Sequence, residues 1–117
     1  MKEIARKALL YDFYGELLTE HQKKVYEDAV MNDFSLSELA EEYGISRQGI
    51  PDLLKRCDTI LEEYESKLGL IKRFSDVRIV ADEMTVILKD LPDATTKAKR
   101  TEIAGALNDK ITKIREI

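Results

Sequence analysis

The sequence predicts an all-α protein, and three observations lead to that fold class. Residues that favour helices are plentiful, whereas Pro and Gly occur only 2 and 5 times in 117 residues. Apolar residues recur at steps of three and four along most of the chain. Residues 35–56, SLSELAEEYGISRQGIPDLLKR, have the pattern of a helix-turn-helix. We therefore expect a helix-turn-helix domain, followed by a long helix and C-terminal helices, in a chain that dimerises.

Two helices are expected before the motif. The first spans about residues 3–18, where apolar side chains follow helical spacing at Ile4, Ala8, Tyr11, Tyr14, Leu17 and Leu18. Thr19 and Gln22 have the spacing of a capping box, which predicts the start of a second helix ending near residue 32. We expect both helices to pack behind the helix-turn-helix and hold its geometry.

The motif itself contains the residue types that two closely crossing helices require. Ser35 and Glu38 form a second capping box, Ala40 is small enough for the crossing, and Gly44 permits the positive φ of the turn. Ser46 is a good N-cap for the second helix. An ordinary αα-hairpin within a helical bundle remains an alternative interpretation of this stretch.

Three stretches also resemble a known family, the YlxM-like helix-turn-helix proteins of Gram-positive bacteria. They are LYDFYGELLTEHQ (10–22), SLSELAEEYGISRQ (35–48) and ILEEYESKL (60–68). The helix-turn-helix of that family resembles region 4 of sigma factors, and its genes usually lie beside those for the signal recognition particle. The resemblance covers about the first two-thirds of the chain. It implies a cytoplasmic, non-enzymatic protein with a regulatory role in protein targeting.

From Ser46 onward the helical pattern is long and has a heptad seam. Apolar residues alternate in steps of four and three at Ile50, Leu54, Cys57, Leu61, Tyr64, Leu68 and Ile71. Such a seam needs a partner, which can be the next helix of the same chain or the same helix of a second chain. We predict a homodimer whose interface contains Cys57, Leu61, Tyr64, Leu68 and Ile71, extended by apolar residues around Val80, Met84 and Ile87.

Gly69 followed by Leu70 predicts a helix end, so we divide the chain into a helix-turn-helix domain, residues 1–68, and a C-terminal helical extension, residues 69–117. A further amphipathic helix is expected over residues 77–91, stopped by Pro92. The last helix spans about residues 95–116. Its basic residues are either a solvated face or an electrostatic contact with nucleic acid or an acidic partner.

The charge distribution singles out one candidate nucleic-acid-binding surface. The net charge of −4 argues against a general nucleic-acid binder, but residues 47–56 carry three basic side chains and one acidic. Arg47 can pair with guanine or phosphate, Gln48 with adenine, and Lys55 with the backbone. The predicted nucleic-acid-binding residues are Ser46, Arg47, Gln48, Lys55 and Arg56.

Three residues of this helix argue against DNA reading. In a helix that begins at Ser46, Pro51 removes a hydrogen bond and crowds the carbonyl of Arg47, at a cost of about 3 kcal/mol in a helix interior. Asp52 brings the wrong charge to a phosphate backbone, and Gly49 loosens the same turn. We expect that replacing Gly49 by Ala and Pro51 by Tyr stabilises the helix.

The sequence offers no catalytic constellation. It has one histidine, His21, one cysteine, Cys57, and no Gly-rich phosphate loop. We expect no enzymatic activity, no metal and no cofactor. A lone thiol, the absence of an apolar run of about 18 residues and the absence of a signal-peptide pattern favour the cytoplasm.

These observations favour a helix-turn-helix regulatory protein that binds DNA, linked by its resemblance to the signal recognition particle pathway. The alternative is a protein- or RNA-interaction module in which the helix-turn-helix is a scaffold. The expected partners are a second copy of the chain, DNA, and protein or RNA components of the signal recognition particle. No membrane partner is expected.

Overall fold

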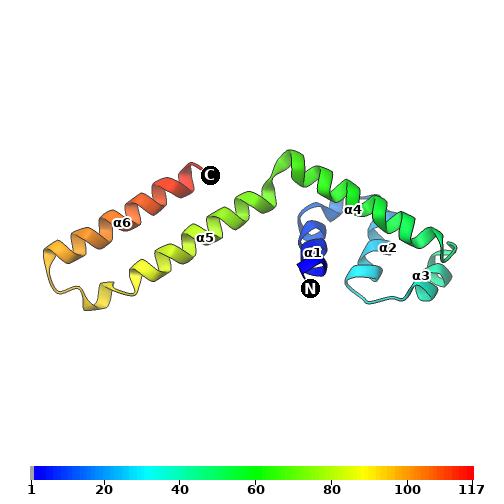
Figure 1. Cartoon of the computed structure of the whole chain (residues 1–117), viewed down its shortest axis with the longest axis horizontal. Coiled ribbons are helices and arrows are strands. Elements are labelled where there is room, and N and C mark those ends of the chain that lie inside the picture. The colour runs from blue at the N-terminus through cyan, green and yellow to red at the C-terminus, as the bar shows by residue number, and fades with distance from the viewer. Residues whose placement is uncertain (1) are drawn as a thin grey trace. The chain divides into compact units, whose positions relative to one another are not determined.

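A computed structural model describes residues 2–117, and every regular element in that range is a helix. The all-α fold class is therefore confirmed for the described part of the chain (Figure 1). The chain divides into two compact units, residues 1–71 and 72–117. The elements are α1 (Lys2–Tyr14), the short 3-10 helix η1 (Gly15–Leu17), α2 (Glu20–Val30), α3 (Leu36–Tyr43), α4 (Gly49–Leu68), α5 (Leu70–Leu88), a second 3-10 helix η2 (Leu91–Asp93) and α6 (Lys97–Arg115).

Helix α4 is the common element of the N-terminal unit, because it contributes to both of its hydrophobic clusters. In one cluster Ile50 packs with Val25 of α2 and Leu39 of α3. In the other, Cys57 and Leu61 pack with residues of α1 and α2 and with Ile71. Leu53 and Leu54 contact both clusters. Burying one side of α4 along most of its length leaves the opposite side in solvent.

The predicted capping boxes are present in the structure. The Thr19 hydroxyl accepts from the Gln22 N–H while the Gln22 side chain accepts from the Thr19 N–H. Ser35 and Glu38 make the same reciprocal pair at the start of α3. The backbone hydrogen bond lowers the pKa of Glu38, since it favours the ionised carboxylate.

Polar contacts connect α1, α2 and α3 to their neighbours around this core. The Arg6 guanidinium donates to both carboxylate oxygens of Glu62 at 2.7 and 2.8 Å, joining α1 to α4. The Tyr26 hydroxyl donates to Asp58 of α4 at 2.7 Å, and the Tyr43 hydroxyl of α3 donates to Asp28 of α2. These bonds orient the helices around apolar contacts that are themselves non-directional.

The end of α4 and the start of α5 are joined by a second polar network. Gly69 has a φ of 62°, which ends α4 as predicted. The Tyr14 hydroxyl donates to the Glu65 carboxylate at 2.5 Å and accepts from the Leu70 N–H at 3.2 Å. The same carboxylate accepts from the Ile71 N–H at 3.0 Å. Two otherwise unpaired N–H groups of α5 are thus satisfied, and burial together with the bond to Glu65 raises the pKa of Tyr14.

This network explains a difference from the sequence prediction. The apolar pattern predicts a helix beginning near residue 77, whereas α5 begins at Leu70. The residues that satisfy the first N–H groups of α5 come from the helix before it and from α1, which is more than fifty residues away in the sequence. A local capping motif is therefore not needed at this position.

The C-terminal unit is an antiparallel hairpin of α5 and α6 (Figure 1). The Thr96 hydroxyl caps α6 by accepting from the Lys99 N–H at 3.1 Å. Glu83 of α5 and Lys110 of α6 form an ion pair at 3.2 Å, which fixes the register of the two helices. The buried apolar residues of this unit are Val80 and Ile103, so its core is small.

We expect Tyr14→Phe to lower the free energy of unfolding by about 1 to 3 kcal/mol, because it removes one partner each from a part-buried carboxylate and a part-buried N–H. Tyr11→Phe is the matched control on the same helix, since the Tyr11 hydroxyl donates to Glu27 in an exposed position. Urea unfolding followed by circular dichroism measures both. Equal losses for the two variants would contradict a special role for the α4–α5 network.

Candidate nucleic-acid interface

The turn of the helix-turn-helix is built from Gly44 to Gln48. Gly44 ends α3 with a φ of 64°, as the sequence predicts, and its N–H donates to the Ala40 carbonyl. The Gly49 N–H donates to both the hydroxyl and the carbonyl oxygen of Ser46, each at 3.0 Å. Ser46 therefore satisfies a backbone donor at the helix start, as predicted for an N-cap, and the regular helix α4 begins three residues later, at Gly49.

This later start weakens the argument against Pro51. Pro51 is the third residue of α4. The Ile50 N–H bonds to the Ser46 carbonyl at 3.3 Å, so Pro51 forgoes the next bond of this series, to the Arg47 carbonyl, but it does so at the start of the helix, where the loss costs less than the value of about 3 kcal/mol for a helix interior. Residues 47 and 48 form a turn, so the irregularity expected around Pro51 is confined to the residues before α4.

Gly49 is required for a reason that the sequence does not show. A Cβ at this position would lie 3.1 Å from both the Ile45 Cγ2 and the Ser46 hydroxyl oxygen. Both contacts are tight, and the hydroxyl already accepts the Gly49 N–H. These contacts argue against the Gly49→Ala part of the stabilisation expected for the double variant, because the added methyl group crowds the hydroxyl that caps the helix.

The predicted nucleic-acid-binding residues are all exposed at the start of α4 and on its solvent side. These residues are Ser46, Arg47, Gln48, Lys55 and Arg56. Within the described part of the chain, no ion pair involves any of the three basic residues among them. Their charges are therefore not neutralised by a salt bridge, as contact with a phosphate backbone would require.

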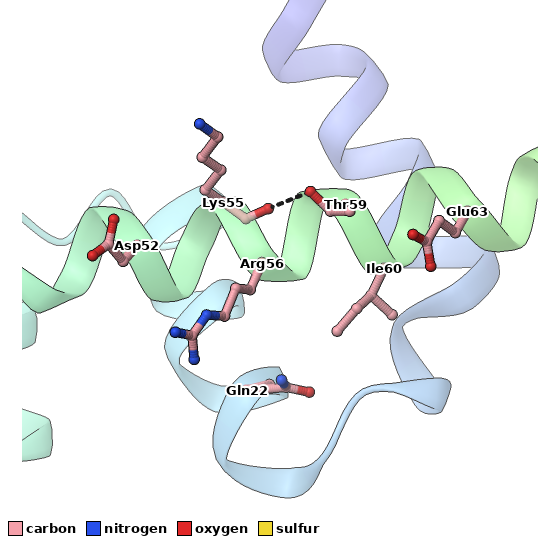
Figure 2. A pocket seen from close by; sticks show the side chains of 7 residues that line it. All are labelled: Gln22, Asp52, Lys55, Arg56, Thr59, Ile60 and Glu63. Atoms are coloured by element: carbon pink, nitrogen blue, oxygen red, sulfur yellow. Dashed lines mark hydrogen bonds between the residues drawn. The ribbon is translucent and has the colours of Figure 1, made fainter.

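The five residues do not form one patch. Figure 2 shows Arg56 pointing toward α2, into the space beside Gln22, while Lys55 points to the other side of α4. Arg47 and Gln48 lie in the turn before the helix. A ligand can therefore contact this region in two places: over the turn and Lys55, or between α4 and α2.

The space between α4 and α2 is a shallow groove of about 580 Å³ (Figure 2). Its lining is mixed, with Arg56 and Ile60 set between the carboxylates Asp52 and Glu63. The residues that line it are Gln22, Asp52, Lys55, Arg56, Thr59, Ile60 and Glu63. Gln22, Thr59, Ile60 and Glu63 were not identified as site residues from the sequence. Helical spacing alone puts Thr59, Ile60 and Glu63 on the same side of α4 as Arg56, whereas only the packing of α2 on α4 brings Gln22 beside them.

The wider surface of the N-terminal unit is acidic. Residues 1–71 carry nine basic and fifteen acidic side chains, a net charge of −6. Helix α3, which precedes the turn, exposes Glu38, Glu41 and Glu42. Phosphate attraction at this site is therefore local to a few basic residues and opposed by its surroundings.

The residues predicted to form a dimer interface lie elsewhere than expected. Cys57, Leu61 and Ile71 are in the core of the N-terminal unit, packed with Leu10 and Tyr14 of α1, so a second chain cannot contact them. Tyr64 is half-buried and stacks on Tyr14 at 6.1 Å between ring centroids. Only Leu68 is largely exposed, at 46%. Of the two partners that the sequence left open for this seam, a helix of the same chain covers Cys57, Leu61 and Ile71, so these three residues do not need a second chain.

Within the described residues no group of three or more His, Cys, Asp or Glu side chains could hold a metal ion. Burial raises the pKa of the Cys57 thiol to about 11, so it is protonated at neutral pH. Among the described helices, none combines the length and apolar character that crossing a membrane requires.

Comparison with known proteins agrees with this architecture. Residues 1–103 match the UPF0122 family, described as "Putative helix-turn-helix protein, YlxM / p13 like". A UPF0122 protein of Thermoanaerobacter pseudethanolicus is 39% identical over 109 residues, covering 93% of this chain and 91% of that protein. A relative from Halalkalibacterium halodurans is 40% identical over 106 residues, 91% of each chain. One from Bacillus pumilus is 37% identical over 114 residues, 97% of each.

We expect Pro51→Ala to change the free energy of unfolding by less than about 1 kcal/mol, because Pro51 lies in the first turn of α4.

Gly49→Ala should give no gain or a loss, despite the better helix propensity of Ala, because of its two 3.1 Å contacts. Gly105→Ala in α6 is the control: nothing lies within 4 Å of its Cβ, and a gain of about 0.5 to 1 kcal/mol is expected. Thermal melts compare the three. A gain for Gly49→Ala equal to that of Gly105→Ala would contradict the crowding.

Proposed function

The chain belongs to the UPF0122 family of YlxM / p13-like helix-turn-helix proteins, and on this premise we propose that it is a regulatory protein without catalytic activity that binds nucleic acid through the start and exposed side of α4. The observation that carries the proposal is that Arg47, Gln48 and Lys55 are exposed and that, among the residues that the structure describes, neither Arg47 nor Lys55 has a salt bridge. These side chains are in a turn and a helix whose opposite side is fixed in the core.

The chemistry of these side chains suits the groove of a duplex. An Arg can donate two hydrogen bonds to guanine, a Gln can pair with adenine, and a Lys can contact phosphate. Because Pro51 lies at the start of α4 and not in its interior, it argues only weakly against this use of the helix. The small size of the basic area, surrounded by an N-terminal unit of net charge −6, favours weak binding with few phosphate contacts.

The biological setting we propose comes from the family resemblance alone. YlxM-like proteins are linked to the signal recognition particle, so the candidate ligands are duplex DNA and the RNA of that particle. Both ligands present phosphates and base edges, and the exposed Arg47 and Gln48 could contact either. Cytoplasmic location belongs to the same proposal.

A second candidate function is supported by the groove between α2 and α4. There Arg56 and Ile60 lie between the carboxylates of Asp52 and Glu63. An apolar residue flanked by charges of both signs is better suited to a peptide segment than to a phosphate backbone. In this alternative the helix-turn-helix is a scaffold for protein binding, and the turn with Arg47 has no role in it.

The proposal is tested by fluorescence anisotropy at low salt with duplex DNA and with signal recognition particle RNA. We expect Arg47→Ala to weaken binding by about tenfold, the loss of one good base or phosphate contact. The logarithm of the affinity should fall with that of salt concentration by about 0.9 for each phosphate neutralised, a total of about 2 to 3. Lys67→Ala is the control, because Lys67 is an exposed cation in the last turn of the same helix.

Three results would contradict nucleic-acid binding through α4: no binding of either ligand at low salt, equal losses for Arg47→Ala and Lys67→Ala, or binding that salt does not affect. Peptide or protein binding that is lost in Arg56→Ala and unchanged in Arg47→Ala would instead support the second candidate function.

A further inference from the structure

The C-terminal unit has a second apolar stripe on each helix, which the other helix of the unit covers only in part. In α5 the positions that face α6 include Val80 and Glu83, as the burial of one and the ion pair of the other demonstrate. One residue after each facing position, a second apolar stripe follows the heptad spacing of three and four, and it consists of Val77, Ala81, Met84 and Leu88. Val77 and Met84 are half-buried, whereas Ala81 is exposed and Leu88 is 45% exposed.

Helix α6 has a matching stripe. Ile103 and Lys110 face α5, and one residue after such positions come Ala104, Leu107, Ile111 and Ile114, again at steps of three and four. Ile111 is 41% exposed. Both second stripes are rotated from the facing stripes by one residue, about 100° in the same sense. Because the helices are antiparallel, equal rotations put both stripes on the same side of the hairpin, and this side is here called the hairpin face.

The hairpin face is too large and too apolar for a stable, isolated hairpin. A unit of this size buries little of its surface, and only Val80 and Ile103 are fully covered in it. At about 100 to 200 Å² per side chain, the exposed and half-buried residues of the two stripes leave roughly 400 Å² of apolar surface on this face. Stable protein interfaces bury about 800 Å² on each partner, of which about 65% is apolar in homodimers. The two areas are of the same order.

The shape of the hairpin face is complementary to the same face of a second copy of the chain. The Glu83–Lys110 pair sets the register, so that Ala81 is level with Ile111 and Leu88 is level with Ala104. These two levels thus each have one large and one small side chain, on opposite helices, whereas the levels of Met84 with Leu107 and of Val77 with Ile114 have two large ones. A two-fold axis that runs in the plane of the face, across the helices near Met84 and Leu107, brings opposite levels of two copies together.

We propose that the hairpin face binds a second copy of this chain, giving an antiparallel four-helix bundle made of two hairpins. Under the two-fold axis, Leu88 of each copy packs over Ala81 of the other, and Ile111 of each packs over Ala104 of the other. Helices with heptad stripes pack in this way in four-helix bundles. The dimer predicted from the sequence is retained, but its interface moves from the seam around Cys57 and Leu61 to the hairpin face.

Light scattering on the full-length chain at tens of micromolar tests this interface. We expect the mass of a dimer, and a monomer with unchanged helical content for Leu88→Lys and for Ile111→Lys, since both side chains are already partly exposed. Val86→Lys is the matched control: Val86 lies on the other flank of α5 and is 62% exposed, so the variant should remain a dimer.

Cross-linking tests the position of the two-fold axis without a charged substitution. Met84→Cys places a thiol near the axis, where it meets its counterpart, so mild oxidation should give a chain linked to its copy. Val86→Cys should not cross-link at the same rate. The native Cys57 does not interfere, because it is fully buried and its raised pKa of about 11 keeps the thiol protonated.

A monomeric unmodified protein at tens of micromolar would overturn the proposal. So would a dimer that Val86→Lys disrupts as strongly as Leu88→Lys, because the interface would then be on the other flank of α5.

The salt dependence of the dimer distinguishes an apolar interface from an association driven by charge. The dimer should persist at about 1 M salt, where the screening length is about 3 Å, and dissociation under these conditions would contradict an apolar interface.

Discussion

The structure depends on the burial of one side of α4. Ile50 packs on α2 and α3 near its start, and Cys57 and Leu61 pack on α1 and α2 further along. The same helix therefore holds the N-terminal unit together and presents the candidate interface on its opposite side. This dual role explains why the candidate side chains are few. The positions of α4 that recur at steps of three and four are needed for packing, so only the remaining positions can carry side chains for binding.

The helix-turn-helix is adapted to an unusual start of its second helix. Residues 47 and 48 form a turn, Ser46 accepts from the Gly49 N–H, and Pro51 lies at the start of α4, where a missing N–H costs less than in the helix interior. The arrangement puts Arg47 and Gln48 at the very tip of the motif. A side chain at such a tip has more freedom to reach a ligand, and also more entropy to lose on binding, than one on a regular helix.

The two units differ in how their apolar surface is covered. In the N-terminal unit the heptad seam of α4 is covered by α1, and directional bonds such as Tyr26 to Asp58 and Tyr14 to Glu65 fix the helices around it. The C-terminal hairpin has two helices and therefore one contact surface, which leaves a second apolar stripe on each helix. The proposed functions are divided accordingly, with ligand binding assigned to α4 and self-association to α5 and α6.

The sequence by itself determined the local elements. Helical spacing, the capping boxes at Thr19 and Ser35, and the glycines at 44 and 69 identified most helices and their ends, because each depends on residues within a few positions of one another. The resemblance to YlxM-like proteins likewise rested on local stretches, and the family match confirms it. The exposed Arg47, Gln48 and Lys55 were also predictable, since they fall opposite the apolar positions of the pattern.

Only the tertiary structure decided which partner covers each apolar stripe. A heptad seam indicates that a helix must pack on something, but Cys57 and Leu61 meet α1, which is distant in sequence, and not a second chain. The start of α5 at Leu70 depends on a hydroxyl and a carboxylate from other helices, and the need for Gly49 depends on where Ile45 and Ser46 lie. Periodicity fixes which side of a helix is apolar, whereas the identity of its neighbour depends on contacts between residues far apart in the chain.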